Sequence, residues 1–208
     1  MTPEQMVSGV QAFTRRWKFD VLSIGYPGPV RGGMPAAEPH NLGHGWMGFD
    51  FQHAFHRPVK VINDAAMQAI GSYKQGKMLF IGLGTGLGSA FIVDGVLAPT
   101  ELGQLPYKKG TFEDYVGVRG LDKYGIKKWR TTVKDVVRRL IDALQPDDVV
   151  IGGGNVRKLK TLPAGCRLGD NANAFLGGFR LWEPKKRAKC RLCETAQPQN
   201  GKGKRGRI

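Results

Sequence analysis

Hydrophobic and polar positions alternate along the chain in a way that predicts helices and strands in turn. Residues 2–5 (TPEQ) form a capping box with proline at the first helical position, which predicts a helix over about 3–17. The expected apolar face of this helix is formed by Met6, Val10, Phe13 and Trp17. Short apolar runs at 20–24 and 58–62 then predict two buried strands.

The segment between those two strands has the composition of a long loop. Glycine and proline recur from Gly25 to Trp46, before a short helix expected at 50–56, and loops of this length in compact domains are usually functional. The second strand ends at Asn63 and Asp64, directly before a helical run. An Asp at this position can be a helix cap or a catalytic carboxylate, and the local pattern is compatible with both.

A glycine-rich stretch at residues 78–97 presents glycine at every second position in its centre, at Gly82, Gly84, Gly86 and Gly88. Strand-like runs flank it, and Asp94 with Gly95 predicts a type I′ hairpin turn. A Rossmann loop is excluded because no helix follows the glycines, and the Walker A lysine is absent. Backbone N–H groups around Thr85 can therefore meet phosphate oxygens directly. The alternative is a glycine ladder that lets another backbone pack closely.

A second glycine cluster follows a long amphipathic helix. The apolar face of that helix is formed by Trp129, Val133, Val136, Val137, Leu140, Ile141 and Leu144. The strand at 147–155 (DDVVIGGGN) ends in Gly152, Gly153, Gly154 and Asn155. Bare backbone at the carboxyl edge of a sheet can hold a flat ligand or a phosphate. Alternatively, these glycines form an ordinary tight turn from the strand into a helix.

Charge is concentrated at the C-terminus. The chain has 208 residues, 41% hydrophobic content and a net charge of +15, and residues 183–208 contain nine Lys or Arg against two Glu. This composition predicts a disordered tail, either a solvated terminus or a segment that attracts polyphosphate or RNA. The single Cys190-x-x-Cys193 pair within it is weak evidence for zinc.

Targeting and redox signals predict a cytoplasmic protein. No apolar run reaches the roughly 18 residues of a membrane span, and the N-terminus lacks the order of a secretory signal. An odd count of three cysteines fits a reducing compartment. We expect no metal site at the histidines, which lie in loops and on a helix surface without a nearby thiolate: His40, His44, His53 and His56.

Several motifs, taken in order, resemble the ROK (repressor, open reading frame, kinase) family of sugar kinases, and within it the polyphosphate/ATP glucokinase branch. They are VIND at 61–64, GLGTGLGSA at 82–90, ELGQLPY at 101–107, FEDYVG at 112–117, VVIGGGN at 149–155 and CRLGDNANAFLGGFRLW at 166–182. The resemblance implies an α/β protein with the two-lobed actin-like ATPase fold, which is related to ribonuclease H. Sugar and phosphoryl donor would meet in the cleft between the lobes.

The resemblance also assigns residues. It implies that Asp64 is the catalytic base. The expected sugar-binding residues are Asn63, Glu101, Gln104, Glu113 and Gly28. The expected phosphate- and nucleotide-binding residues are Gly84, Thr85, Gly86, Gly152, Gly153, Gly154 and Asn155.

The implied function is transfer of phosphate from ATP or polyphosphate, with Mg²⁺, to the 6-hydroxyl of glucose, by a homodimer. The expected organisation is a partial N-terminal lobe at 1–70, a C-terminal lobe with a closing helix at 71–182, and the tail at 183–208. A non-catalytic sugar-binding or regulatory protein is the alternative. A repressor is not expected, because one helix and no helix-turn-helix precedes the first strand. Nucleic acid is expected to bind only through the tail, if at all.

Three departures from the family pattern qualify these expectations. Position 104 is Gln where many members have His, and no Cys/His zinc loop follows Gly103, so no zinc is expected. Members also begin with strands that carry a D-x-G-G-T motif, whereas this chain begins at the helix that follows them. We therefore expect an incomplete N-terminal lobe, an unpaired edge on the strand at 20–24, and little or no kinase activity unless an upstream segment or a partner chain supplies the strands.

Overall fold

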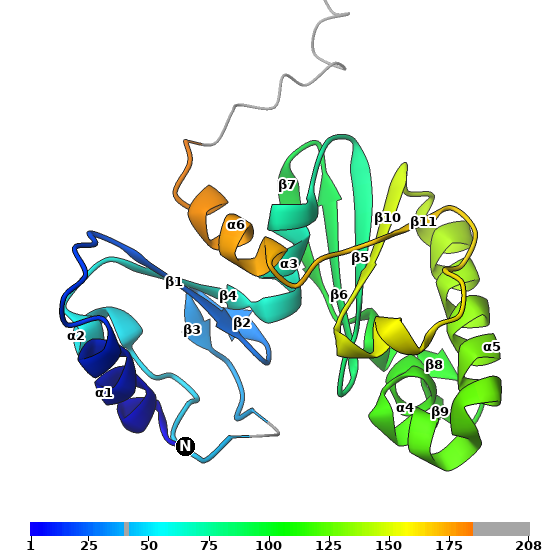
Figure 1. The fold of residues 1–208 in the computed structure, drawn as a ribbon, viewed down its shortest axis with the longest axis horizontal. Helices are drawn as coiled ribbons and strands as arrows, with labels where there is room; N and C mark the ends of the chain where they lie inside the picture. The colour runs from blue at the N-terminus through cyan, green and yellow to red at the C-terminus, as the bar shows by residue number, and fades with distance from the viewer. Residues whose placement is uncertain (40–41, 185–208) are drawn as a thin grey trace, which may run out of the picture.

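The computed structural model describes residues 1–39 and 42–184 as a mixed α/β protein (Figure 1). The tail expected at 183–208 lies almost entirely outside the described residues, as does His40. The helices are α1 Pro3–Phe13, α2 Phe51–Phe55, α3 Asp64–Ser72, α4 Phe112–Val116, α5 Val118–Leu144 and α6 Asn173–Arg180, with 3-10 turns η1 Leu102–Gln104 and η2 Gly154–Lys158. The strands are β1 Leu22–Tyr26, β2 Val30–Arg31, β3 Met34–Pro35, β4 Val59–Asn63, β5 Lys77–Leu83, β6 Leu87–Val93, β7 Val96–Thr100, β8 Pro106–Tyr107, β9 Gly110–Thr111, β10 Asp148–Gly152 and β11 Cys166–Leu168.

Two sheets flank the helices α3 and α6 (Figure 1). The larger has the order β11-β10-β5-β6-β7, with β5 parallel to β10 and antiparallel to β6. The smaller pairs β1 with β4 in parallel, so that Tyr26 lies opposite Asn63. Among the described residues β1 has a strand partner on one side only.

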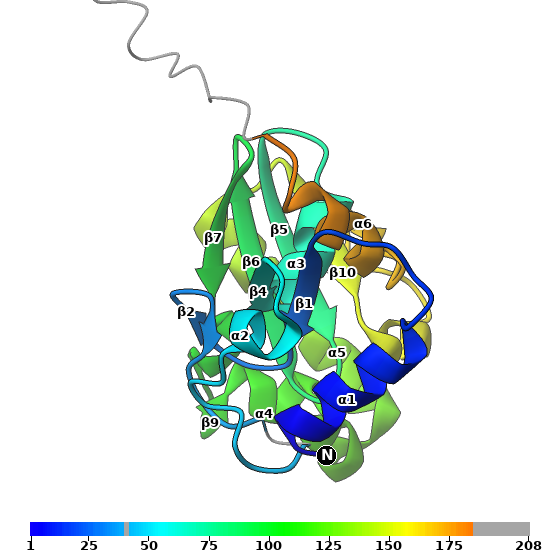
Figure 2. The ribbon, with the colours of Figure 1, turned by 90° about the vertical axis from the view of Figure 1, so that its left-hand side faces the viewer.

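Helices cover both faces of the smaller sheet. In two perpendicular views α6 lies on one face, and α1 and α2 lie on the other (Figures 1 and 2). On the α6 side the Ser23 hydroxyl donates to the Gly178 carbonyl at 2.7 Å and accepts from the Trp182 indole at 2.9 Å. On the opposite side Val7 and Phe51 pack in one buried cluster with Val61 of β4. The strand that ends at Asn63 is therefore held from both sides.

The long helix α5 covers the larger sheet with the predicted apolar face. Its buried residues Trp129, Val133 and Val137 pack against Leu79 and Ile81 of β5. The Trp129 indole donates to the Val116 carbonyl at 2.7 Å, which fixes the junction between α4 and α5. The helix bends at a glycine whose φ of 73° is non-helical, Gly125.

Helices α3 and α6 cross at a pair of glycines. A Cβ at Gly71 would overlap the Asn173 carbonyl, and a Cβ at Gly177 would overlap the Met67 carbonyl. The Arg180 guanidinium then donates to the last carbonyls of α3, those of Ile70 and Gly71, at 2.8 and 3.1 Å. Backbone therefore rests on backbone at this crossing, and α6 closes the C-terminal end of α3.

The structure corrects several predicted boundaries. The first helix ends at Phe13 rather than near residue 17, because the Thr14 hydroxyl and N–H both bond to the Val10 carbonyl and end the helix. Trp17, expected on the buried face, is 62% exposed and contacts Phe13 edge-to-face at 5.6 Å. The strand expected at 20–24 is β1, shifted toward the carboxyl end, and the strand expected at 147–155 ends at Gly152.

The segment from Gly25 to Trp46 is less irregular than its composition indicated. It contains the small antiparallel pair of β2 and β3, which turns at Gly32 and Gly33 with positive φ at both. The hairpin at Asp94 and Gly95 is confirmed, since both residues have positive φ and Val93 pairs with Val96. The central glycines lie on β5, β6 and the turn between them, as predicted.

Candidate active site

The first group of candidate residues lies where β4 passes into α3. Asn63 is the N-cap of α3, because its side-chain oxygen accepts the Ala66 N–H at 3.1 Å. Its amide nitrogen donates to the Gly28 carbonyl at 3.2 Å and ties the strand end to the loop after β1. Asp64 begins the helix, and its Oδ1 accepts the Ala65 N–H at 2.7 Å. The capping role is therefore filled by Asn63, and the second carboxylate oxygen of Asp64 stays available.

The Asp64 carboxylate is in an environment that disfavours its charge. The residue reaches solvent, but its carboxyl group is enclosed by protein atoms on most sides, and this burial raises its pKa despite the lowering effect of the Ala65 N–H. A carboxylate with a raised pKa accepts a proton more readily than an ordinary Asp. The environment therefore suits a general base.

Glu101 lies between β7 and η1 and faces the same region. Burial raises its pKa, and the negative charges of Glu113 and Asp64 raise it further. Its position depends on Ser89, a buried residue of β6 that the sequence did not single out. The Ser89 hydroxyl donates to the Thr100 carbonyl at 3.1 Å and accepts from the Leu102 N–H at 3.0 Å, so it holds the residues on both sides of Glu101.

Glu113 is presented by the short helix α4. A capping box formed by Thr111 and Asp114 starts this helix. The Glu113 Oε2 accepts the Leu87 N–H at 3.4 Å, and a Cβ at Gly86 would lie 2.5 Å from the same oxygen. Gly86 therefore lacks a side chain because Glu113 occupies that space. Arg119 lies 3.5 Å from the other Glu113 oxygen.

The turn between β5 and β6 meets both the second glycine cluster and α5. The Asn155 amide donates to the Gly84 carbonyl at 2.8 Å, and a Cβ at Gly153 would overlap the Leu83 backbone. The Thr85 carbonyl accepts the Val118 N–H at 2.9 Å. Within the described residues no partner is present for the Thr85 N–H or hydroxyl. Asn155 and Val118 therefore anchor the turn from two sides, and the Thr85 N–H and hydroxyl remain available as hydrogen-bond donors.

A cleft of about 350 Å³ is lined by residues of β2, β4, α3, β6 and β7. Of the predicted catalytic and sugar-binding residues, Asn63 and Glu101 line it, whereas Asp64, Gly28, Gln104 and Glu113 do not. The other lining residues are Pro29, Val30, Arg31, Gly33, Val61, Ile62, Ala66, Ser89, Leu97, Pro99 and Thr100. Arg31, Ser89 and Thr100 are polar lining residues that the sequence reasoning missed, and no local signal distinguishes them from ordinary strand and loop residues.

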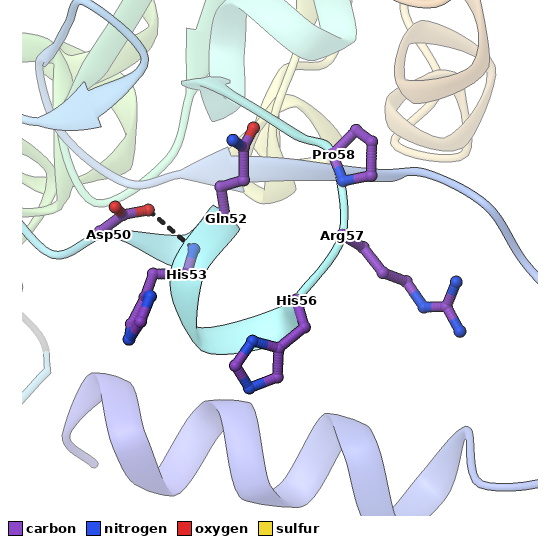
Figure 3. A pocket seen from close by; sticks show the side chains of 6 residues that line it. All are labelled: Asp50, Gln52, His53, His56, Arg57 and Pro58. Carbon is purple, nitrogen blue, oxygen red and sulfur yellow. Dashed lines mark hydrogen bonds between the residues drawn. The ribbon is translucent and has the colours of Figure 1, made fainter.

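A second, more open depression of about 480 Å³ lies beside α2 (Figure 3). It is lined by Asp50, Gln52, His53, His56, Arg57 and Pro58. Asp50 caps α2 through the His53 N–H at 2.9 Å, and the two imidazole rings meet edge-to-face at 5.8 Å. Over residues 1–39 and 42–184, no cluster of three or more His, Cys, Asp or Glu has the geometry of a metal site. No helix in that same part of the chain is long and apolar enough to cross a membrane.

Comparison with known proteins places the chain in a family. Residues 1–104 match the model of the ROK family, which is half of the chain. The chain belongs to the ROK family. The polyphosphate glucokinase of Mycobacterium leprae (strain TN) is 34% identical to it over 155 residues, 66% of this chain and 47% of that protein. The polyphosphate glucokinase of Mycobacterium tuberculosis (strain H37Rv) is 28% identical over 152 residues, 57% of that protein. This ROK chain spans about half the length of the curated relatives it matches.

Solved ROK structures share the fold. The inorganic polyphosphate/ATP-glucomannokinase of Arthrobacter sp. strain KM matches with a TM-score of 0.68 and 24% identity, over 84% of this chain and 79% of that one. A ROK family glucokinase of Streptomyces griseus, in complex with glucose and AMPPNP, matches with a TM-score of 0.70 and 15% identity over 86% and 88%. The ROK chain therefore has the actin-like ATPase fold of these kinases.

Proposed function

We propose that this ROK protein is a hexose kinase of the glucokinase type, which transfers a phosphoryl group from ATP or polyphosphate to the 6-hydroxyl of glucose. One observation carries the proposal: the charges of Asp64 and Glu113 act on Glu101, which lines the cleft with Asn63, and Glu113 contacts a glycine turn whose Thr85 donors are unused. Carboxylates pair with sugar hydroxyls, and bare backbone N–H groups pair with phosphates. The site therefore combines the two chemistries that a sugar kinase needs.

On the acceptor side, Asp64 takes the proton of the 6-hydroxyl as that oxygen attacks phosphorus. Glu101 and Glu113 accept hydrogen bonds from ring hydroxyls, and the Asn63 and Gln104 amides supply donors and acceptors. Gly28 permits the loop to approach the sugar. Most of the rate enhancement in this reaction comes from positioning and from electrostatic stabilisation, which explains why a rigid strand end carries the base.

On the donor side, the Gly84–Gly86 turn offers the Thr85 N–H and hydroxyl to phosphate oxygens. Gly154, where a Cβ would meet no atom within 4 Å, leaves open backbone for a nucleotide, while Gly152 and Gly153 pack against Phe80 and Leu83 and Asn155 holds the turn. Mg²⁺ would arrive with the donor, since it prefers one or two carboxylates together with phosphates and water. The described residues contain no cluster of ligands that would bind the ion alone, so phosphate oxygens and water would supply most of its shell. When bound, the ion would supply neutralisation of the charge that develops on the phosphates.

The test is calorimetric titration with glucose, then with ATP·Mg²⁺ or polyphosphate in the presence of glucose, followed by assay of glucose 6-phosphate. Binding of both partners with product formation supports a glucokinase. Glucose binding without donor binding supports the alternative, a non-catalytic sugar-binding or regulatory protein. Absence of glucose binding by a folded chain contradicts both.

Removal of the Glu101 charge should weaken the binding of glucose. Glu101→Gln is expected to raise the dissociation constant for glucose about tenfold, because an amide loses one of the charged acceptors for a hydroxyl pair. Calorimetry measures the change. Glu4→Gln, which removes a charge from exposed α1, is the matched control and should leave glucose affinity unchanged. Equal affinities for both variants would remove Glu101 from the sugar site.

Removal of the Thr85 hydroxyl should weaken binding of the phosphoryl donor and leave binding of the sugar unchanged. Thr85→Val is expected to raise the KM for ATP or polyphosphate about tenfold and to leave the KM for glucose within twofold, because one hydrogen bond to a charged phosphate is lost. Steady-state kinetics with each substrate varied in turn measures this. The control is Thr131→Val on the exposed face of α5, and the opposite pattern at Thr85 would refute the phosphate-turn assignment.

A further inference from the structure

A cluster of lysines and tyrosines lies on the surface beside the glycine turn. It comprises Lys108, Tyr115, Tyr124, Lys123 and Lys128, from the β8–β9 turn, α4 and the first part of α5. Its surroundings are strongly basic, since residues 123–139 contain seven Lys or Arg and a single Asp. We refer to these five residues as the lysine–tyrosine cluster. None of its members lines either cleft described above.

The tyrosines form the base of the cluster. The Tyr115 and Tyr124 rings stack with centroids 5.1 Å apart and an interplanar angle of 9°. Lys123 and Lys128 place their ammonium groups 5.4 and 4.9 Å from the Tyr124 centroid, and Lys108 lies 5.4 Å from the Tyr115 centroid. Attraction to the ring faces seats each ammonium group and restricts its rotamers. Gly125, whose non-helical backbone bends α5, lies between Lys123 and Lys128.

The phenol oxygens lie in a strongly positive field. The pKa of Tyr115 is lowered, first by its hydrogen bond with the Tyr124 hydroxyl, then by the Lys109 backbone and by the charges of Lys108 and Lys123. Two neighbouring carboxylates are already engaged, whereas Asp122, next to Lys123 in the sequence, forms no ion pair among the described residues. Asp114 pairs with Arg119 at 3.1 Å, and Asp135 accepts from Arg139 at 2.9 Å. The three lysines are exposed, and no ion pair within the described residues neutralises them.

The cluster adjoins the proposed donor turn. Tyr115 precedes Gly117 by two residues, and a Cβ at Gly117 would lie 2.6 Å from the Thr85 carbonyl. The Val118 N–H holds that same carbonyl, and Lys123 follows five residues later. At about 1.5 Å per helical residue, the cluster begins roughly 8 Å along α5 from the point where the helix meets the turn. An anionic chain held at Thr85 would reach it after a few phosphate units.

We propose that the lysine–tyrosine cluster binds the distal part of a linear polyphosphate chain whose terminal phosphoryl group lies at the Thr85 turn. This inference rests on the proposed function and deepens it, because it assigns polyphosphate rather than ATP to contacts outside the cleft. Ammonium groups are compact, strongly hydrated charges that bind phosphates without requiring a fixed plane. A row of them suits a repeating anion that can slide by one unit after each transfer.

Polyphosphate fits this surface better than nucleic acid does. Proteins that bind single-stranded nucleic acid offer free aromatic faces on which bases stack. Here the Tyr115 face is covered by Tyr124, and the Tyr124 ring is approached by two ammonium groups. The rings are therefore used to seat cations, and only charge is presented outward.

The experiment compares two triple variants of the full chain. Lys108→Gln/Lys123→Gln/Lys128→Gln removes the cluster charge, and Arg15→Gln/Arg16→Gln/Lys18→Gln removes the same charge from exposed residues after α1. Binding of end-labelled long-chain polyphosphate and of tripolyphosphate is measured by fluorescence anisotropy at fixed ionic strength. We expect the cluster variant to bind the long chain at least about tenfold more weakly, with tripolyphosphate and ATP·Mg²⁺ within twofold, because the short anions reach only the turn.

The outcomes separate this inference from the proposed function. Equal losses in both triple variants would mean general charge attraction and would overturn the inference, as would equal loss of tripolyphosphate binding. A single-stranded RNA that competes as well as polyphosphate for the cluster would also overturn it. Failure of the proposed function is recognised separately, as absence of glucose binding to the unmodified chain while its long-chain polyphosphate affinity still depends on the cluster.

Discussion

Asp64→Asn is expected to lower glucose 6-phosphate formation about 10³-fold and to leave glucose affinity within about tenfold, because it removes the proposed base and keeps its shape. The Asn oxygen can still accept the Ala65 N–H that Asp64 accepts at 2.7 Å, and Asn63 still caps α3. Coupled assay of the product and calorimetry with glucose measure the two quantities. Loss of glucose binding together with an unfolded chain would instead assign Asp64 a structural role.

The raised pKa of Asp64 gives this variant a second expected effect. A carboxyl group whose pKa is raised by folding stabilises the fold while it is protonated, and this contribution is lost as the pH rises through the folded-state pKa. At neutral pH the unmodified protein therefore holds an unfavourable buried charge. Asp64→Asn should raise the Tm at neutral pH, and the difference should shrink below the ordinary pKa range of Asp. A variant that lowers the Tm at neutral pH contradicts burial as the dominant influence on this group.

The pH dependence of catalysis should carry the same signature. A base must be ionised to accept a proton. The rate should therefore rise with pH, and the midpoint of this rise should lie above the ordinary pKa of Asp. The Glu101 carboxyl, whose pKa is also raised, should give glucose affinity a parallel rise. Measurement of the rate and of the glucose affinity across the same pH series separates the two pH dependences.

Gly177→Ala is expected to destabilise the protein by about 3 kcal/mol, a fall in Tm of roughly 6–12 °C for a chain of this size. The new Cβ would overlap the Met67 carbonyl, and neither backbone can yield without separating α6 from α3. Differential scanning calorimetry or urea denaturation measures the change. Loss of the crossing also loosens α3, so the rate of phosphoryl transfer should fall with stability.

Gly9→Ala is the matched control for the Gly177 substitution. Gly9 lies inside α1, and a Cβ there meets no atom within 4 Å. Alanine is the better helix former, so this variant should gain about 0.5–1 kcal/mol. Destabilisation of both variants to the same extent would mean that helix propensity, rather than the crossing, explains the Gly177 effect.

Features that local chemistry decides were predictable from the sequence. The capping box at Thr2, the hairpin at Asp94 and Gly95, and the position of the central glycines on strands and a turn are all present in the structure. Each depends on residues only a few positions apart. The order of motifs along the chain indicated the family, which the match of residues 1–104 to the ROK model confirms.

Features that depend on distant partners were not predictable. Trp17 has helical spacing from Phe13, but the Thr14 side chain ends the helix before it. Ser89 gains its role from Thr100 and Leu102, which β6–β7 pairing brings to it. The stacking of Tyr115 on Tyr124 joins α4 to α5, and the apolar pattern of α5 does not encode it.

The glycine crossing between α3 and α6 also orders events during synthesis. Arg180 and the Ile70 carbonyl that it bonds are 110 residues apart, and α6 is the last described helix to leave the ribosome. Until it does, Met67 and Gly71 have no covering backbone, and the helix that begins at Asp64 lacks its largest packing partner. Asp64 therefore gains the full packing support of its helix only after residues 173–180 have been synthesised.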